Sequence, residues 1–343
     1  MRKTVTSLLL FTIVFSLAAQ QKAAVDKVKF FEEGPVIKAT LSAKFSKWLG
    51  RQAKAGDSTI GNFVLAFPDS GFLAGNVTVS IRGNFRRENC FIPPLRIDFK
   101  KPNSALAALG TLKLVSSCKM GEDYENYLLT EYLVYKMYNL LTEKSFRVRL
   151  LQLTYRDSTN KVKEFTRYAF LLEDTKDMAK RNKMRECKQL NVGTEQTNRE
   201  QMTLVAIFQY MIGNTDWSVP VKHNIRLIND NNDNSALLPY PVPYDFDYCG
   251  LVNAEYAVPY EELGLDNVRQ RLYRGYPRTM EELNKTLQVF KEKKEKIYSL
   301  VTEMKLLGKN KQKDIINYLD GFYDIINKPK EVESIFIKNA RKN

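Results

Sequence analysis

The sequence predicts an α+β protein made of two lobes. Three observations support this: strand-like alternation dominates up to residue 116, one helical segment follows, and helical patterns dominate again after residue 177. A ligand crevice is expected between the two lobes, because concave binding sites commonly form at such boundaries.

The first lobe is expected to span residues 20–175 and to be rich in β-structure. Apolar and polar residues alternate in its strand-like segments, as in half-buried strands. Tyr127, Glu131 and Tyr135 recur every four residues, which predicts an amphipathic helix over 122–141. Strands are predicted over 76–85, 94–101, 110–116, 146–155 and 166–174.

The second lobe is expected to span residues 176–343 and to be mostly helical. A helix is predicted over 199–214, and Gly213 provides its C-terminal stop. Two short strands, 224–228 and 241–247, bracket a polar turn and predict an embedded hairpin. The sequence after residue 277 is helical, and its lysine-rich stretch is interpreted as a solvated helix surface.

The N-terminus is typical of a secretory signal peptide over residues 1–19. Arg2 and Lys3 precede an apolar run that ends in small residues. That run is short for a bilayer span, so a permanent anchor is the less favoured alternative, and no later segment is transmembrane. The mature chain is therefore expected in the periplasm or outside the cell.

The net charge is +14, and loss of Arg2 and Lys3 with the signal peptide lowers it to about +12. This positive net charge favours an anionic ligand such as a nucleotide. The alternative is that the protein is exported and basic without binding an anion. Nucleic acid is not expected as a partner.

Cysteine and histidine usage limits the chemistry. The four cysteines allow three pairings if all are oxidised, and export permits disulfides. A single histidine argues against both a zinc site and a Ser-His-Asp triad, and the sequence holds no Gly-x-Ser-x-Gly elbow. His223 is interpreted as a surface residue at a strand entry.

Asp216, Asn224, Asp245 and Asp247 gather around the predicted hairpin. One interpretation is that they are turn and capping residues. The other is a magnesium site, because Mg²⁺ prefers carboxylate and amide oxygens and phosphoryl transfer also needs a carboxylate near the attacking hydroxyl. A hairpin that joins Asn224 to Asp245 would leave Asp216 on the adjoining loop as the base.

Several segments resemble a known family. GNTDW, KHNIRLI and VPYDFDYCG are similar to the catalytic centre of atypical protein kinases of the HipA and CotH (spore-coat kinase) type. Upstream, IRGNFRRENCFIPPLRIDFKK and the predicted helix over 122–141 look like two further CotH segments. The likeness covers roughly residues 78–250. It implies a two-lobed protein-kinase-like fold with a β-rich N-lobe and a mostly helical C-lobe.

The resemblance also implies roles at the predicted hairpin. Asp216 would orient the acceptor hydroxyl. Asn224 and Asp245 would hold Mg²⁺ or Mn²⁺, with Asp247 as a further metal ligand.

For the nucleotide, the resemblance implies that Glu131 pairs with the phosphate-binding cation and that Glu173 lies near the adenine. Glu131 as a solvent-facing helix residue is the alternative. The cation itself stays open: Arg96, Lys100 and Lys113 compete for the role, and Arg82 and Arg86 could also reach phosphate.

The function implied is an exported ATP- and Mg²⁺-dependent phosphotransferase that acts on a hydroxyl of a protein or glycan, with AMP transfer left open. The alternative is a catalytically inactive, kinase-fold binding module of the cell envelope.

Overall fold

The computed structural model describes residues 24–32, 34–49, 53–67, 71–83, 85–231 and 237–342. The signal peptide predicted for residues 1–19 lies outside this part of the chain. None of the helices in the described ranges is both long and apolar enough to cross a membrane.

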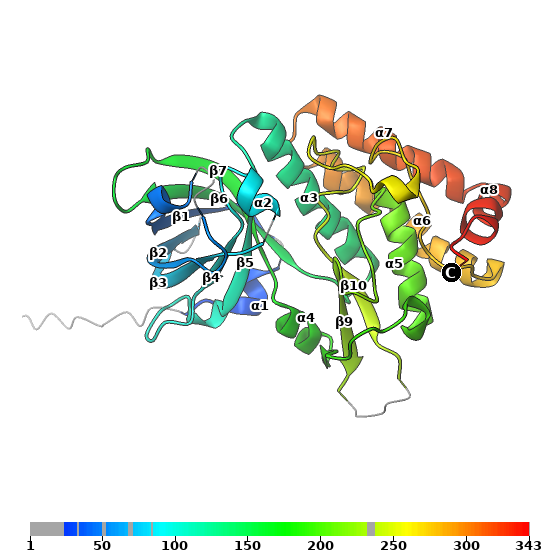
Figure 1. Cartoon of the computed structure of the whole chain (residues 1–343), viewed down its shortest axis with the longest axis horizontal. Coiled ribbons are helices and arrows are strands. Elements are labelled where there is room, and N and C mark those ends of the chain that lie inside the picture. The colour runs from blue at the N-terminus through cyan, green and yellow to red at the C-terminus, as the bar shows by residue number, and fades with distance from the viewer. Residues whose placement is uncertain are drawn as a thin grey trace, which may run out of the picture.

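The N-terminal strands close into a barrel in the order β1-β2-β3-β4-β5-β7-β6 (Figure 1). Closure comes from parallel pairing of the first strand with the sixth, in which Ile37 lies opposite Leu151. The barrel strands are β1 (Ile37–Ala43), β2 (Ser58–Phe67), β3 (Gly71–Ile81), β4 (Leu95–Asp98), β5 (Thr111–Ser116), β6 (Val148–Asp157) and β7 (Phe165–Leu172).

The predicted two-lobed, protein-kinase-like fold is therefore wrong. In the structure, the β-rich part of the chain is a closed barrel of seven strands. The described residues also form a small second sheet and eight α-helices. Alternation of apolar and polar residues identifies strands, but it carries no information on which edges meet. Here the two edge strands pair with each other, which removes free edges from the sheet.

Alternating side chains fill the barrel interior. Leu41, Phe63, Val79 and Ile97 are fully buried, and each comes from a different strand. The rings of Phe63 and Phe99 meet edge to face with centroids 5.2 Å apart. The barrel is thus a packed core, as expected for a small barrel.

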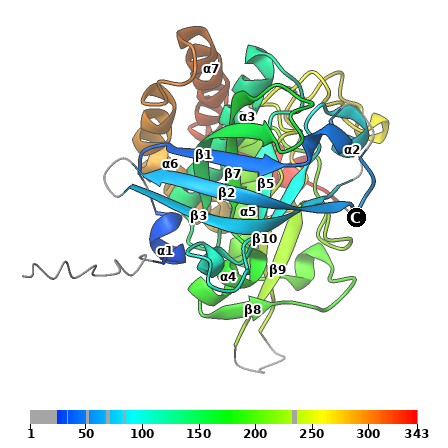
Figure 2. The same cartoon turned by 90° about the vertical axis from the view of Figure 1, so that its left-hand side faces the viewer.

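The second sheet has the strand order β10-β9-β8 and lies beneath the barrel in the view of Figure 2. Its strands are β8 (Met184–Glu186), β9 (Ile225–Asp230) and β10 (Tyr240–Pro243). The predicted hairpin is confirmed, because β9 and β10 pair antiparallel with Pro243 opposite Ile225.

The helix predicted over 122–141 is confirmed as α3 (Glu122–Leu141). Three acidic residues in its first turn complement the positive end of the helix dipole. Figure 1 shows α3 between the barrel and the other long helices. Buried side chains lie on most of its faces, so the predicted amphipathic character is wrong. The remaining helices are α1 (Lys27–Phe30), α2 (Phe85–Asn89), α4 (Thr175–Arg181), α5 (Arg199–Ile212), α6 (Met280–Thr302), α7 (Lys309–Ile326) and α8 (Pro329–Glu333).

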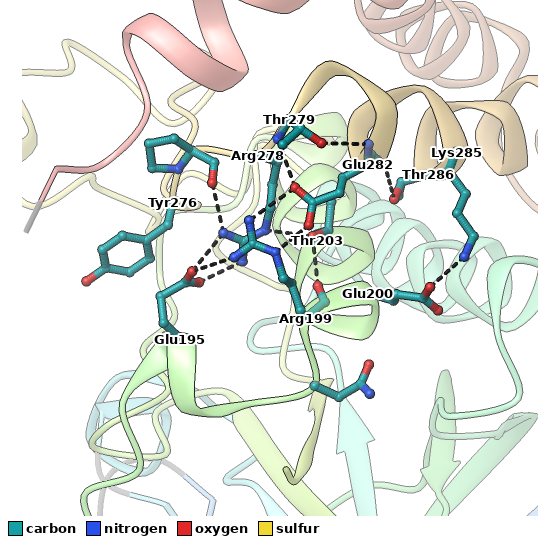
Figure 3. A network of polar contacts seen from close by, with 12 residues as sticks. Glu195, Arg199, Glu200, Thr203, Tyr276, Arg278, Thr279, Glu282, Lys285 and Thr286 are labelled. Carbon is teal, nitrogen blue, oxygen red and sulfur yellow. Dashed lines mark hydrogen bonds and ion pairs between the residues drawn. The ribbon is translucent and has the colours of Figure 1, made fainter. Parts of the chain in front are cut away.

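A polar network joins the start of α6 to α5 (Figure 3). Thr279 and Glu282 form a capping box at the N-terminus of α6. Glu282 also accepts from Arg199 on α5, and the buried Arg278 guanidinium reaches Glu195 at 2.6 Å. These groups are paired with one another, so we interpret the network as an anchor for α6 and not as a binding site.

One disulfide, Cys90–Cys118, joins the end of α2 to the segment that follows β5. Cys187 and Cys249 are free and buried. The four cysteines are therefore not all oxidised, and the described residues contain one disulfide.

Candidate functional site

Asp216 lies on a buried loop that follows α5. The helix ends at Gly213, which adopts the left-handed conformation with φ of 65°. Asn214 then accepts from the backbone N–H of Asp216 at 2.9 Å, so Asn214 is a turn-forming residue. The turn leaves the carboxylate of Asp216 free to meet other side chains.

Three donors hold the Asp216 carboxylate. Asn224 Nδ2 donates to Oδ2 at 2.9 Å, and His223 Nε2 and the Tyr260 hydroxyl lie 2.7 and 3.0 Å from Oδ1. The Asp216 side chain is only 15% exposed. Charge-assisted bonds of this kind fix the orientation of a carboxylate more firmly than neutral ones.

Asn224 and Asp245 stand at the same end of the β9–β10 hairpin. The N–H of Tyr244 donates to the backbone oxygen of Asn224 at 3.0 Å, which places the two predicted metal ligands on adjacent backbone segments. Both have positive φ, 50° for Asn224 and 64° for Asp245. Such strained backbone is common at functional sites, although Asn and Asp tolerate it best.

The Asp245 backbone is held by α3, because its N–H donates to the hydroxyl of Tyr135 at 2.8 Å. Burial lowers the pKa of both Arg82 and Lys113, and the nearby Asp245 carboxylate opposes that change in each case. Asp245 therefore links the hairpin to the cations of the barrel.

Asp247 and Glu131 form a buried acidic pair close to Asp245. Burial, then the nearby charge of Asp245, raises the pKa of Asp247 to about 6, against the opposing effect of Arg86. Burial, then Asp247 and Asp245, raises the pKa of Glu131 well above its usual range. Like charges in a dry site cannot all ionise easily, so the nearby charge of Asp245 adds to the effect of burial on both pKa values.

The partners of this pair come from three segments. Tyr256 donates to Asp247 Oδ2 at 3.2 Å, and Arg86 Nη1 lies 4.0 Å from the same atom. Phe246 N–H bonds Glu131 and opposes the rise in its pKa, while Glu131 Oε1 has no hydrogen-bond partner among the described residues. Glu131 is thus a buried residue, and the solvent-facing alternative is wrong.

A cavity of about 290 Å³ opens between the barrel and the second sheet. Lys113 and Arg226 both lie 4.6 Å from the ring centre of Tyr244 in its wall. Burial, then Arg82, lowers the pKa of Lys113 to about 8. The cavity is therefore a partly desolvated cationic site, which suits an anionic ligand.

The structure separates the basic residues that the sequence left open as candidates for phosphate binding. Arg96 and Lys113 are cross-strand neighbours and both line the cavity. Arg82 is close enough to Lys113 to lower its pKa. Lys100 lies past the end of β4, is exposed, and is not among the residues that line the cavity.

Glu173 lies in the cavity wall, where its buried carboxylate is held by hydrogen bonds. It accepts from the backbone N–H of Arg147 at 2.9 Å and from Arg181 Nη2 at 3.0 Å. These bonds fix the chain after β7 in the cavity wall, and the resemblance implies adenine recognition near this segment.

The donor set fits a magnesium ion with few protein ligands. Among the described residues, no group of three or more His, Cys, Asp or Glu is placed to hold a metal. Mg²⁺, however, commonly takes one or two carboxylates and completes its shell with water and phosphate oxygens. Asn224 turns its amide nitrogen to Asp216, so its Oδ1 is the atom that would bind a metal, and Asp245 would supply a carboxylate.

Sequence reasoning missed several residues of this site. The prediction that His223 is a surface residue is confirmed, but its contact with Asp216 was not predicted. Tyr260 and Arg226 carried no recognisable motif. Their placement depends on a loop after the hairpin and on strand pairing, which sequence spacing alone does not predict.

No protein-family model matches the chain, and no curated protein matches it. The likeness to CotH and HipA enzymes therefore stays a prediction that rests on the segments between about residues 78 and 250.

Proposed function

We propose that the chain is a phosphotransferase that uses ATP and Mg²⁺ and acts on a hydroxyl of a protein or glycan, or transfers AMP to it. Asp216 stands beside the acceptor hydroxyl. Asn224 and Asp245 hold the metal, with Asp247 behind them, and the cations of the cavity bind the nucleotide phosphates.

One observation carries the proposal. The Asp216 carboxylate, held by Asn224, is joined through the strained hairpin end to Asp245. Asp245 in turn interacts with Lys113 in the cavity wall and with Arg82, which lies near Lys113. This chain of contacts supplies a carboxylate for the acceptor, oxygen ligands for a metal and cations for phosphate. Those are the parts that phosphoryl transfer needs.

The proposal includes export to the periplasm or the cell exterior. The signal-like N-terminus supports it, and so does the Cys90–Cys118 disulfide, because such bridges persist mainly in oxidising compartments.

A catalytically inactive envelope protein that binds a protein or glycan is the second candidate. The observation that favours it concerns Glu131, which is implied to pair with the phosphate-binding cation. Glu131 interacts with Phe246 N–H and with the charges of Arg86 and Arg82, and among the described residues no ion pair joins it to Arg96 or Lys113 in the cavity wall.

Thermal unfolding with ATP and either Mg²⁺ or Mn²⁺ separates the two candidates. A ligand at 100 times its dissociation constant stabilises the folded state by about 2.7 kcal/mol. We expect metal-dependent stabilisation of the wild type that is lost in Asp245→Ala and retained in Asp123→Ala, an exposed residue of α3. Absence of any nucleotide effect on the wild type would contradict the phosphotransferase. A metal-dependent effect that survives Asp245→Ala would contradict the ligand assignment.

A further inference from the structure

The outer edge of β8 is open in the described part of the chain. This strand is the last of the second sheet, pairs there with β9 alone, and lies at the margin of the sheet in Figure 2. An edge strand presents backbone N–H and C=O groups with which an extended segment of another chain can pair.

The register shows which backbone groups of β8 face outward. Cys187 N–H donates to the backbone oxygen of Leu227 at 2.8 Å, two positions beyond Arg185 in the same register. Hydrogen-bonded and non-hydrogen-bonded pairs alternate along an antiparallel ladder, so Arg185 bonds to β9 while Met184 and Glu186 do not. The N–H and C=O groups of Met184 and Glu186 therefore point away from β9.

A pocket of about 530 Å³ follows this edge, and we call it the β8 pocket. It is lined by the three residues of β8, by Lys188 and Asn229, and by Lys176 on α4. Consecutive strand residues point to opposite faces of a sheet, so a pocket lined by all of β8 runs along the strand. Thr175, the residue before Lys176, lines the cationic cavity, so the two sites are neighbours.

The segment that forms most of the β8 pocket is strongly basic. Residues 175–190 hold six basic and two acidic side chains, and one of the acids, Asp177, is paired with Lys27 at 2.5 Å. Four exposed lysines of this segment form no side-chain hydrogen bond or ion pair among the described residues: Lys176, Lys180, Lys183 and Lys188. Their charges attract a negatively charged partner.

The edge is also preformed. Lys222 Nζ donates to the backbone oxygen of Cys187 at 2.9 Å, directly after β8. The side chains of Cys187, Met178 and Ala179 are buried in the main hydrophobic core, which holds both β8 and α4 in place. A partner therefore does not have to order this surface on binding, which lowers the cost of association.

We propose that the β8 pocket binds an extended, acidic segment of another protein, which adds to β8 as a further strand. The backbone of the segment pairs with Met184 and Glu186, and its carboxylates meet Lys176 and Lys188. A membrane or a polysaccharide can contact the lysines, but neither offers a peptide backbone to the strand edge. The proposal does not depend on phosphotransfer by this chain.

Fluorescence anisotropy with two labelled peptides tests the proposal. One peptide alternates glutamate with valine, and the other alternates glutamate with proline, which keeps the charge but disrupts strand pairing. We expect the glutamate–valine peptide to bind and its affinity to fall as the salt concentration rises. The glutamate–proline peptide should bind at least about tenfold more weakly, because it loses main-chain hydrogen bonds.

Charge reversal tests the lysines. In Lys176→Glu/Lys188→Glu, two attractions become repulsions, so the affinity for the glutamate–valine peptide should fall at least about tenfold. The matched control Lys291→Glu/Lys296→Glu has the same net charge and changes two exposed residues of α6. It should keep the wild-type affinity at physiological salt, because charges beyond the Debye length are screened.

Replacing Glu186 with proline tests the backbone. Proline removes the N–H that faces the open edge and spares the hydrogen bonds to β9, a position that edge strands tolerate. Glu186→Ala removes the same carboxylate and keeps the N–H. We expect Glu186→Pro to bind the glutamate–valine peptide severalfold more weakly than Glu186→Ala, with far-UV circular dichroism to confirm that both are folded.

Four outcomes would overturn the proposal. Equal binding of the two peptides would show that charge alone is recognised. No binding of either peptide at low salt, or equal losses in the two charge-reversal variants, would exclude the β8 pocket as the site. Binding of vesicles that contain anionic lipid, without binding of the glutamate–valine peptide, would assign the lysines to a membrane. If Glu186→Pro does not fold, the two peptides still test strand pairing.

Discussion

Replacing Asp247 with asparagine should stabilise the protein at neutral pH. The carboxyl is 7% exposed and its pKa is raised from 3.8 to about 6 by burial and by Asp245. The folded state therefore holds this proton more tightly than the unfolded state. The associated stability is fully present below pH 3.8 and is lost as the pH rises through about 6.

The magnitude follows from the size of the shift. About two pH units at about 1.36 kcal/mol each give a cost near 3 kcal/mol at pH 7, as an upper limit. Asparagine carries no charge, and its oxygen can still accept from Tyr256. It does lose the attraction to Arg86, so we expect a gain of about 1–3 kcal/mol.

Denaturant unfolding of the wild type and Asp247→Asn at pH 7 and pH 4.5 measures this effect. The advantage of the variant should shrink by about 2 kcal/mol at the lower pH, because most of the linked ionisation lies above it. Asp123→Asn, at an exposed position, should show no comparable pH dependence. A variant that is less stable than the wild type at pH 7, by an amount independent of pH, would refute the argument.

Three further predictions concern the cavity and the fold. The pKa of Lys113 is lowered to about 8, so the affinity for ATP, measured by calorimetry, should weaken above pH 8 by up to about tenfold per unit, and less in Lys113→Arg. Replacing Cys90 and Cys118 with serine opens a bridge across 28 residues and should cost about 3–4 kcal/mol in denaturant unfolding. Gly213→Ala forces a Cβ into the Tyr318 hydroxyl and should lower the melting temperature more than Gly264→Ala, where φ is also positive but the space is open; equal effects would contradict the clash.

The sequence identified the elements better than their arrangement. The helix over 122–141 matches α3 because the helical spacing of its residues from Tyr127 to Leu141 extends over about four turns. The hairpin follows from two apolar runs around a polar turn. Barrel closure depends on pairing of Ile37 with Leu151, which are far apart in the chain. No local pattern encodes that contact, and the analogy to a two-lobed fold replaced the missing information.

The same distinction holds at the candidate site. Asn224 and Asp245 could be placed together because one hairpin carries both of them. The cation could not be selected, since the β4–β5 register decides that Arg96 and Lys113 face the cavity. The contact of His223 with Asp216 depends on a left-handed residue in the intervening turn, which the sequence does not reveal.

The most direct test of the central claim is transfer of labelled γ-phosphate from ATP by the purified chain, in the presence and absence of Mg²⁺. We predict metal-dependent transfer by the wild type, a loss of at least about 100-fold in Asp216→Asn, and a loss of metal dependence in Asp245→Ala. Absence of transfer from the wild type with either Mg²⁺ or Mn²⁺, or equal rates in all three proteins, would contradict the account.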